Sequence, residues 1–154
     1  MKKEMWLVVA LAAVIIILLG VFVFLPTKKT PQQNPPVTTS GIEITSPKAN
    51  EVVSSPLKIT GVVNGSGWSG FEGQVGSVVL TFKSSDSLEI VNIDSVPLVA
   101  TTEWTKLPTN FEATIDLGRL TFSDDYKAFL TFRNENPSGD PAKDKTFVLP
   151  VTIK

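Results

Sequence analysis

The 154-residue sequence predicts an all-β fold: a two-sheet antiparallel sandwich of seven or eight strands, behind one N-terminal transmembrane helix and a proline-rich linker. Three observations support this prediction. Apolar residues alternate with polar ones throughout residues 41–154, an unbroken apolar run occupies residues 6–25, and prolines and polar residues fill residues 26–40 between them. Strand periodicity, a membrane-length apolar run and a linker composition define the organisation of the chain.

The apolar run at 6–25 predicts a transmembrane helix. It reads WLVVALAAVIIILLGVFVFL, and Gly20 is its single residue that is not apolar. Twenty residues at about 1.5 Å each span roughly 30 Å, which matches the hydrocarbon core of a bilayer. A cleaved signal peptide is the alternative, but its apolar region is typically shorter, at about 7–15 residues. We expect an uncleaved anchor, with a cytoplasmic stub at 1–5 and the rest of the chain outside the cytoplasmic membrane.

The spacer at 26–40 reads PTKKTPQQNPPVTTS, which has too few apolar residues to form a core. Its prolines favour extended polyproline II structure at about 3.1 Å per residue, so it could hold a domain up to ~45 Å from the bilayer. We expect a disordered stalk.

Composition excludes several kinds of chemistry. The chain has no His and no Cys, which excludes an imidazole base, a thiol nucleophile, a disulfide and any site that needs these ligands. Residues 41–154 carry 10 basic and 14 acidic side chains, a net charge of −4. A mildly acidic domain lacks the basic surface that nucleic acids require. A binding or spacing module is therefore favoured over an enzyme, with no nucleic-acid partner and no cofactor.

Alternation with a period of two predicts the strands. The clearest series are those at 57–63, 111–117, 126–132 and 147–153, and weaker strands are expected at 42–45, 68–74, 77–83 and 88–94, with 96–100 as a further candidate. Turn signals such as NGSG, SSDS, TKLPTN and NPSGDP separate them. Seven or eight short strands in 114 residues (41–154) are typical of an immunoglobulin-type sandwich. Pro150 lacks a backbone N–H, so we expect its strand to lie at an edge or to bend there.

Four segments of this domain resemble a known family. ITSPKANEVVSSPLKITGVVNG has two Ser-Pro turns and a strand ending in Gly, and it is followed by GWSGFEGQVGSVVL, TEWTKLPTNFEATIDL and ENPSGDPAKDKTFVLPVTIK. Together they resemble the bacterial spore-germination immunoglobulin-like domain, over about residues 42–154. The resemblance implies an extracytoplasmic immunoglobulin-like module on an anchored or secreted protein, without catalytic residues to transfer.

Two groups of residues are candidates for a binding surface. Trp68, Phe71 and Trp104 lie close to turns, where aromatic faces can bind sugar rings or peptides, or can close the ends of the core. Glu72 is next to Phe71, and Asn136, Pro137, Ser138 and Gly139 form a turn that also suits an exposed recognition loop.

Three further motifs have simpler explanations. Gly65 to Gly70 matches G-x-G-x-x-G, but no helical period follows, so we interpret it as a connection between strands rather than a dinucleotide site. Glu72, Glu103 and Glu112 could supply paired carboxylates for glycoside hydrolysis, but nothing places two of them across a cleft. Calcium favours oxygen-rich loops, and such loops occur at Asp124-Asp125 and between Asn134 and Asp144. The regular Asp-x-Asp-x-Asp-Gly spacing is absent, so we expect no metal site.

The sequence therefore predicts a single-pass membrane protein with a noncatalytic interaction or scaffold domain at the cell envelope. Its partners would be the lipid bilayer through residues 6–25 and an envelope protein that the sequence does not identify. The alternative is a cell-wall carbohydrate-binding module in which Trp68 and Trp104 stack on sugar rings.

Overall fold

The computed structural model describes residues 37–83, 90–93, 95–118 and 125–154. These residues form one curled β-sheet, and none of the helices among them is long and apolar enough to cross a membrane. The predicted anchor at 6–25 and the first eleven residues of the predicted stalk, 26–36, lie outside the described residues. The all-β prediction is confirmed for the described part of the chain.

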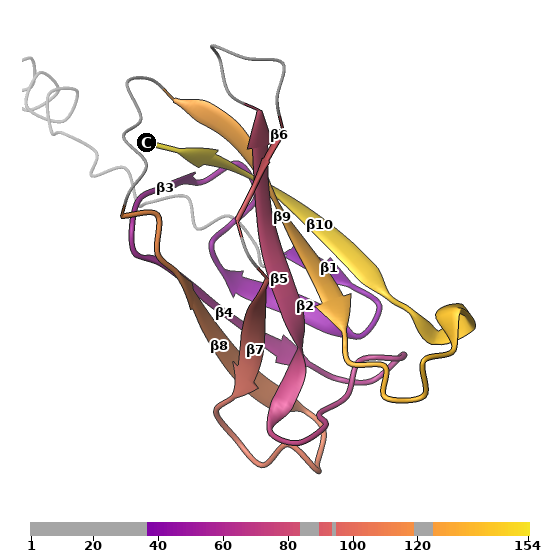
Figure 1. The fold of residues 1–154 in the computed structure, drawn as a ribbon. Coiled ribbons are helices and arrows are strands. Elements are labelled where there is room, and N and C mark those ends of the chain that lie inside the picture. The colour runs from indigo at the N-terminus through magenta and orange to yellow at the C-terminus, as the bar shows by residue number, and fades with distance from the viewer. Residues whose placement is uncertain (1–36, 84–89, 94, 119–124) are drawn as a thin grey trace, which may run out of the picture. The chain divides into compact units, whose positions relative to one another are not determined.

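Ten strands make up the sheet in the described residues, and the seven longer ones have five residues or more (Figure 1). In chain order they are β1 Val37–Thr39, β2 Ile42–Ser46, β3 Val52–Val53, β4 Leu57–Val63, β5 Gln74–Lys83, β6 Ile90–Asn92, β7 Val96–Ala100, β8 Thr109–Ile115, β9 Tyr126–Asn134 and β10 Thr146–Ile153. A 3₁₀ turn at Pro141–Lys143 lies between β9 and β10.

The order of strands across the sheet is β1-β2-β4-β8-β7-β5-β9-β10-β3, with β6 paired to β5 beside this path. All neighbours are antiparallel except β3, which runs parallel to β10. The sheet curls so that β2 and β4 lie behind β5, β9 and β10 in the view of Figure 1. The inward side chains of both halves therefore meet in a single core.

The strict alternation of β8 and β4 explains why these segments form strands with one buried face. In β8, Thr109, Phe111, Ala113 and Ile115 are buried while the residues between them are exposed. The inward residues of β9 and β10, among them Leu130 and Leu149, complete the core from the other side. Burying a large aliphatic side chain contributes about 1.5–3 kcal/mol, and this packing acts without a disulfide because the chain has no Cys.

The structure differs from the expected strands in three places. The segment 68–74 was expected to be a strand, and this is wrong: Phe71 and Gln74 close a tight turn in which Glu72 and Gly73 have positive φ. A non-Gly residue with positive φ cannot continue a strand, so β5 starts only at Gln74. At the second place, β1 lies within the predicted stalk and pairs with β2, so the sheet includes residues 37–39. At the third, the two-residue strand β3 was not expected, and it pairs with the end of β10.

Pro150 lies in β10, where β3 pairs only with the last two residues of the strand. Thr152 donates its backbone N–H to the carbonyl of Glu51 and not to β9. Because backbone groups alternate in direction along a strand, those of Pro150 also point away from β9. The missing N–H of Pro150 therefore removes no bond from the β9–β10 ladder, in agreement with the expected edge position.

Gly61 is a position in β4 where the neighbouring strands leave no room for a side chain. A Cβ atom there would meet the ring of Phe111 and would lie 2.5 Å from the carbonyl oxygen of Glu43. Overpacking of a core typically costs about 1–3 kcal/mol. We expect Gly61→Ala to lower the free energy of unfolding by about this amount, measured as the midpoint of urea denaturation.

Thr114→Ala is the matched control, because Thr114 is exposed on the neighbouring strand β8. It should change stability by less than about 0.5 kcal/mol. An unchanged midpoint for Gly61→Ala would contradict the packing of β4 against β2 and β8.

Candidate functional site

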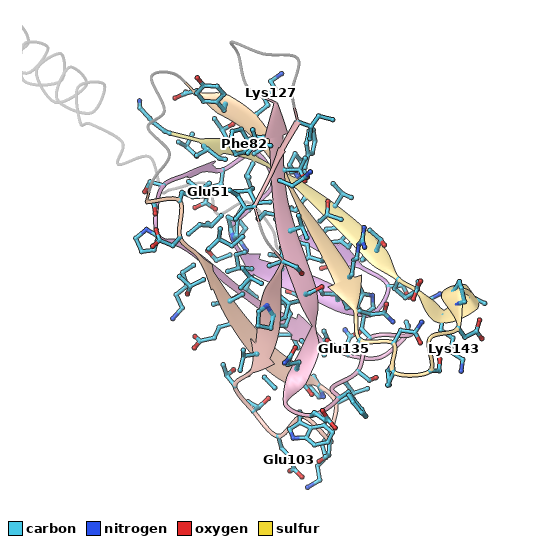
Figure 2. The ribbon with its side chains drawn as sticks, in the orientation of Figure 1. Glu51, Phe82, Glu103, Lys127, Glu135 and Lys143 are labelled. Carbon is cyan, nitrogen blue, oxygen red and sulfur yellow. The ribbon has the colours of Figure 1, made fainter. Side chains whose placement is uncertain are left out.

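Three loops lie at one end of the sheet and carry nearly all of the residues that the sequence indicated for binding. They are the 64–73 loop between β4 and β5, the 101–108 loop between β7 and β8, and the 135–145 loop between β9 and β10. Figure 2 shows Glu103, Glu135 and Lys143 of these loops toward the end opposite to Phe82 and Lys127. We call this end of the domain the loop surface.

The 64–73 loop lies between the other two and contacts both. A Cβ atom on Gly70 would lie 2.5 Å from the carbonyl oxygen of Trp104 and 2.8 Å from its Cβ. A Cβ atom on Gly67 would lie 2.8 Å from Cε of Lys145. The absence of a side chain at Gly70 therefore permits the close approach of the Trp104 backbone. At Gly67 it permits the close approach of the aliphatic part of Lys145.

Trp68 is a core residue, which corrects its assignment as a stacking platform. Its side chain is only 2% exposed, so neither face of the indole is available to a sugar ring. Its backbone N–H donates to the carbonyl of Gly65 at 2.9 Å, and a Cβ atom on Gly41 would lie 2.9 Å from its Cδ1. The 64–73 loop is therefore held to the core by the burial of this indole.

Phe71, Trp104 and Leu107 form an exposed apolar group on the loop surface, which we call the apolar tip. Their exposed fractions are 41%, 38% and 48%. Phe71 and Trp104 were expected to be candidate binding residues, whereas the sequence reasoning missed Leu107. The signal for Leu107 was an apolar residue inside the turn sequence TKLPTN, where no strand face could bury it.

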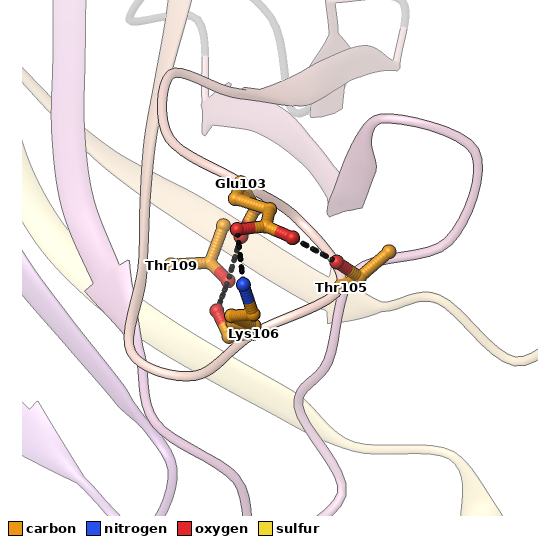
Figure 3. Close-up of polar contacts among 4 residues, drawn as sticks. All are labelled: Glu103, Thr105, Lys106 and Thr109. Atoms are coloured by element: carbon orange, nitrogen blue, oxygen red, sulfur yellow. Dashed lines mark hydrogen bonds and ion pairs between the residues drawn. The ribbon is translucent and has the colours of Figure 1, made fainter.

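The 101–108 loop is held in shape by the polar contacts drawn in Figure 3. The carboxylate of Glu103 accepts hydrogen bonds from Nζ of Lys106 at 2.8 Å and from Oγ1 of Thr105 at 2.9 Å. The buried hydroxyl of Thr109 donates to the carbonyl of Lys106 at 2.8 Å. These bonds fix the turn that presents Trp104.

A pocket of about 390 Å³ lies on the other side of the 64–73 loop, and we call it the polar pocket because seven of its ten lining residues are polar or charged. It is lined by Gly67, Ser69, Asn134, Glu135, Asn136, Pro137, Ser138, Ala142, Lys143 and Lys145. The turn at 136–139 that the sequence indicated is thus brought against the Gly-rich loop, and Gly139 lies exposed at the end of this turn. Amides, hydroxyls and two ammonium groups give the pocket hydrogen-bonding capacity.

Asn134 joins the walls of this pocket. Its side-chain Nδ2 donates to the carbonyls of Gly67 at 2.8 Å and of Lys143 at 3.1 Å, and its Oδ1 accepts from the backbone N–H of Lys145 at 2.8 Å. Within the 135–145 loop, Asn136 donates to the carboxylate of Asp144 at 2.6 Å and accepts from the hydroxyl of Ser138 at 2.7 Å. The sequence did not reveal the role of Asn134 because one of its partners, Gly67, belongs to a distant segment of the chain.

The remaining candidates have ordinary positions. Glu72 is exposed in the turn before β5, and Glu112 forms an ion pair with Lys58 at 3.1 Å on the outer face of β8. Among the described residues no group of three or more acidic side chains could hold a metal ion, and Asp124 lies outside them. The motif at Gly65 to Gly70 connects two strands, as expected.

No family model matches this sequence, and comparisons with curated proteins and with solved structures also found no similar protein.

The hydrogen bonds of Asn134 generate a prediction about the pocket. Asn134→Ala removes three bonds that join β9 to the two loops, and a hydrogen bond typically contributes about 0.5–1.5 kcal/mol. We expect the amide of Lys145 to exchange with solvent at least about tenfold faster, because an opening made easier by about 1.4 kcal/mol raises exchange tenfold. Asn110→Ala, at an exposed position of β8, is the control, and unchanged exchange in Asn134→Ala would refute the bridge.

Glu103 generates a prediction about pH. Hydrogen bonds from Lys106 and then from Thr105 hold the pKa of this carboxyl below its ordinary value of 4.5. A lowered pKa means that the stabilisation is fully present above pH 4.5 and is lost as the pH falls through the lowered pKa. We expect the NMR signal of the Trp104 indole N–H to shift in this acidic range, because the loop loosens when Glu103 is protonated.

Glu103→Gln should abolish this transition, while Glu72→Gln, which removes a carboxylate from the adjacent loop, should leave it in place. A Trp104 signal that still titrates in Glu103→Gln would show that another group controls the loop.

Proposed function

We propose that this chain is a membrane-anchored, noncatalytic interaction module of the bacterial cell envelope, whose domain binds a protein partner through the loop surface. The observation that supports it is the convergence of three loops on one end of a rigid sheet, where they expose Phe71, Trp104 and Leu107 beside a polar pocket. Binding residues are commonly carried on loops that a rigid scaffold positions.

The strand order supports an immunoglobulin-type sandwich. In that fold, strands A, B, E and D form one sheet and strands C, F and G the other. Here β2, β4, β8 and β7 are neighbours in the order that A, B, E and D would have, and β5, β9 and β10 follow the order of C, F and G. The pairing of β7 with β5 joins the two halves. The three loops then correspond to B–C, D–E and F–G, which lie at the same end.

The anchor and the location are proposed from the sequence. The apolar run at 6–25 is long enough to span a bilayer, and residues 26–36 would link it to the domain outside the cytoplasmic membrane. The resemblance over residues 42–154 to the spore-germination immunoglobulin-like domain is consistent with such an extracytoplasmic module.

The composition of the apolar tip favours a protein partner over a wall glycan. Buried aromatic and large apolar side chains dominate the binding energy at protein interfaces, and a polar rim surrounds them. Glu72, Glu103 and Lys106 provide such a rim around the tip. The glycan alternative relied on two exposed indoles, and Trp68 is buried.

The test uses the full-length chain in bacterial cells, with a photoreactive amino acid at Thr102, an exposed position beside the apolar tip. We expect a discrete crosslinked protein adduct that Phe71→Ala and Leu107→Ala remove. Truncating a central interface residue costs about 2 kcal/mol or more, which is roughly a thirtyfold loss of affinity.

A probe at Thr114, on the outer face of β8, is the matched control and should give no adduct that depends on Phe71. Absence of an adduct at Thr102, or an adduct insensitive to both substitutions, would overturn the proposal. Retention on purified peptidoglycan that Trp104→Ala abolishes would favour the glycan alternative instead.

A further inference from the structure

A second exposed apolar surface lies away from the loop surface, on the outer face of β6, β5, β9, β10 and β3. Four of the eight large apolar side chains that are exposed in the described residues belong to it, namely Val52, Ile90, Phe129 and Val148. We call it the β9 face. Its centre contains a hollow of about 280 Å³ lined by Thr81, Phe82, Ile90, Lys127 and Phe129.

The strand register makes these side chains neighbours on one face. Phe129 pairs with Thr81 on β5 and with Pro150 on β10, and the next outward row joins Val79, Thr131 and Val148. An apolar band therefore crosses the strands diagonally. Contiguous apolar surface of this kind usually marks an interaction site.

The charge of the β9 face is opposite to that of the domain as a whole. Among the strand side chains of this face that the structure describes, the charged ones are Lys127 and Arg133, both exposed, and none of the ion pairs in the described residues involves them. Asp125 and Glu135 lie just outside the two ends of β9. No carboxylate lies among the outward residues that are described there. The domain at 41–154 nevertheless has a net charge of −4.

The opposite outer face, on β2, β4 and β8, carries the complementary charge, and we call it the β8 face. Its charged strand residues are Glu43 and Glu112 against Lys58 alone, so two carboxylates face one lysine, and Asp116 lies just after β8. Val62 and the exposed Val99 add apolar area beside them.

We propose that the β9 face of one copy docks on the β8 face of a second copy of this chain, in a head-to-tail contact. A symmetric contact between two β9 faces would oppose Lys127 and Arg133 of one copy to the same residues of the other, which is unfavourable. The head-to-tail contact instead brings cations onto carboxylates and covers the apolar band. Heterologous contacts of this type build rings when the rotation between copies closes and open arrays when it does not.

The first test uses charge reversal in the full-length chain, held in a nonionic detergent and measured by sedimentation velocity. The natural chain should self-associate at about 0.01 M salt, where the Debye length is about 30 Å, and should dissociate near 1 M, where it is about 3 Å. Lys127→Glu combined with Arg133→Glu should weaken association at least about tenfold, because two like-charge contacts replace attractive ones. Glu43→Lys combined with Glu112→Lys should do the same.

A mixture of these two double variants should associate again, since the acidic β9 face of one then meets the basic β8 face of the other. A mixture that stays monomeric, or a natural chain that is monomeric at low salt at every concentration reached, would overturn the proposal. So would binding to anionic lipid vesicles that Lys127→Glu with Arg133→Glu abolishes while the chain stays monomeric.

The second test uses the absence of cysteine from the chain. Thr131→Cys lies on the β9 face and Thr114→Cys on the β8 face. A bifunctional maleimide should link the two variants when they are mixed, while either variant alone should remain uncrosslinked. Crosslinking of Thr131→Cys alone would show a symmetric contact and would overturn the head-to-tail arrangement.

Self-association through the β9 face and partner binding through the loop surface can be tested independently. Phe129→Ser should weaken self-association at least about tenfold and should leave the adduct at Thr102 intact, because one large central apolar contact carries much of an interface. Leu107→Ser removes a side chain of similar exposure from the loop surface and should have the opposite pattern. Self-association that responds to Leu107→Ser and not to Phe129→Ser would overturn the docking of the β9 face.

Discussion

The burial of Trp68 is the constraint on which the arrangement of the loop surface depends. This indole lies in a loop and not in a strand, yet it fills the end of the core beside Gly41 and Gly65. Fully burying such an aromatic side chain is worth about 1.5–3 kcal/mol or more, which is enough to hold a Gly-rich segment in one conformation. With Trp68 held inside, the residues on either side of it must face outward. Ser69 then lines the polar pocket, and Phe71 reaches the apolar tip.

The strands could be predicted from the sequence wherever one face of the sheet is buried and the other is solvated. The segments 57–63 and 111–115 alternate strictly because β4 and β8 have this environment along their whole length. The same logic failed at 68–74, where Trp68 and Phe71 look like strand residues but Glu72 and Gly73 turn the chain. β1 escaped prediction because it has only three residues and lies at the end of a segment rich in proline and polar residues.

The candidate site was predictable in its residue types and only partly in its geometry. The turn at 136–139 was identified because Asn, Pro, Ser and Gly favour turns, and the aromatics were identified because they lie close to turn signals. Nothing local distinguishes Trp68 from Trp104, since both follow turn residues. Long-range neighbours decide between them. Gly41 leaves room for the indole of Trp68, whereas Gly70 packs against the backbone of Trp104. The role of Asn134 was hidden for the same reason, because one of its partners, Gly67, belongs to a distant segment.

The domain thus separates two kinds of surface on one core. Loops at one end carry exposed aromatics beside a hydrogen-bonding pocket, and the outer strand faces carry opposite charges on opposite sides. A module with this division could hold a partner at its end while it contacts copies of itself through its sides. Neither arrangement needs a reactive side chain, a metal or a cofactor, which agrees with the absence of His and Cys from the sequence.

The most direct test of this account is the chemical accessibility of the two indoles in the folded full-length chain. Oxidation by a tryptophan-selective reagent, followed by peptide mass spectrometry, reports Trp68 and Trp104 separately. The account predicts rapid modification of Trp104 and protection of Trp68 until the protein is unfolded in denaturant. Equal rates of modification for both residues in the native protein would contradict it, because the 64–73 loop would then not be anchored in the core.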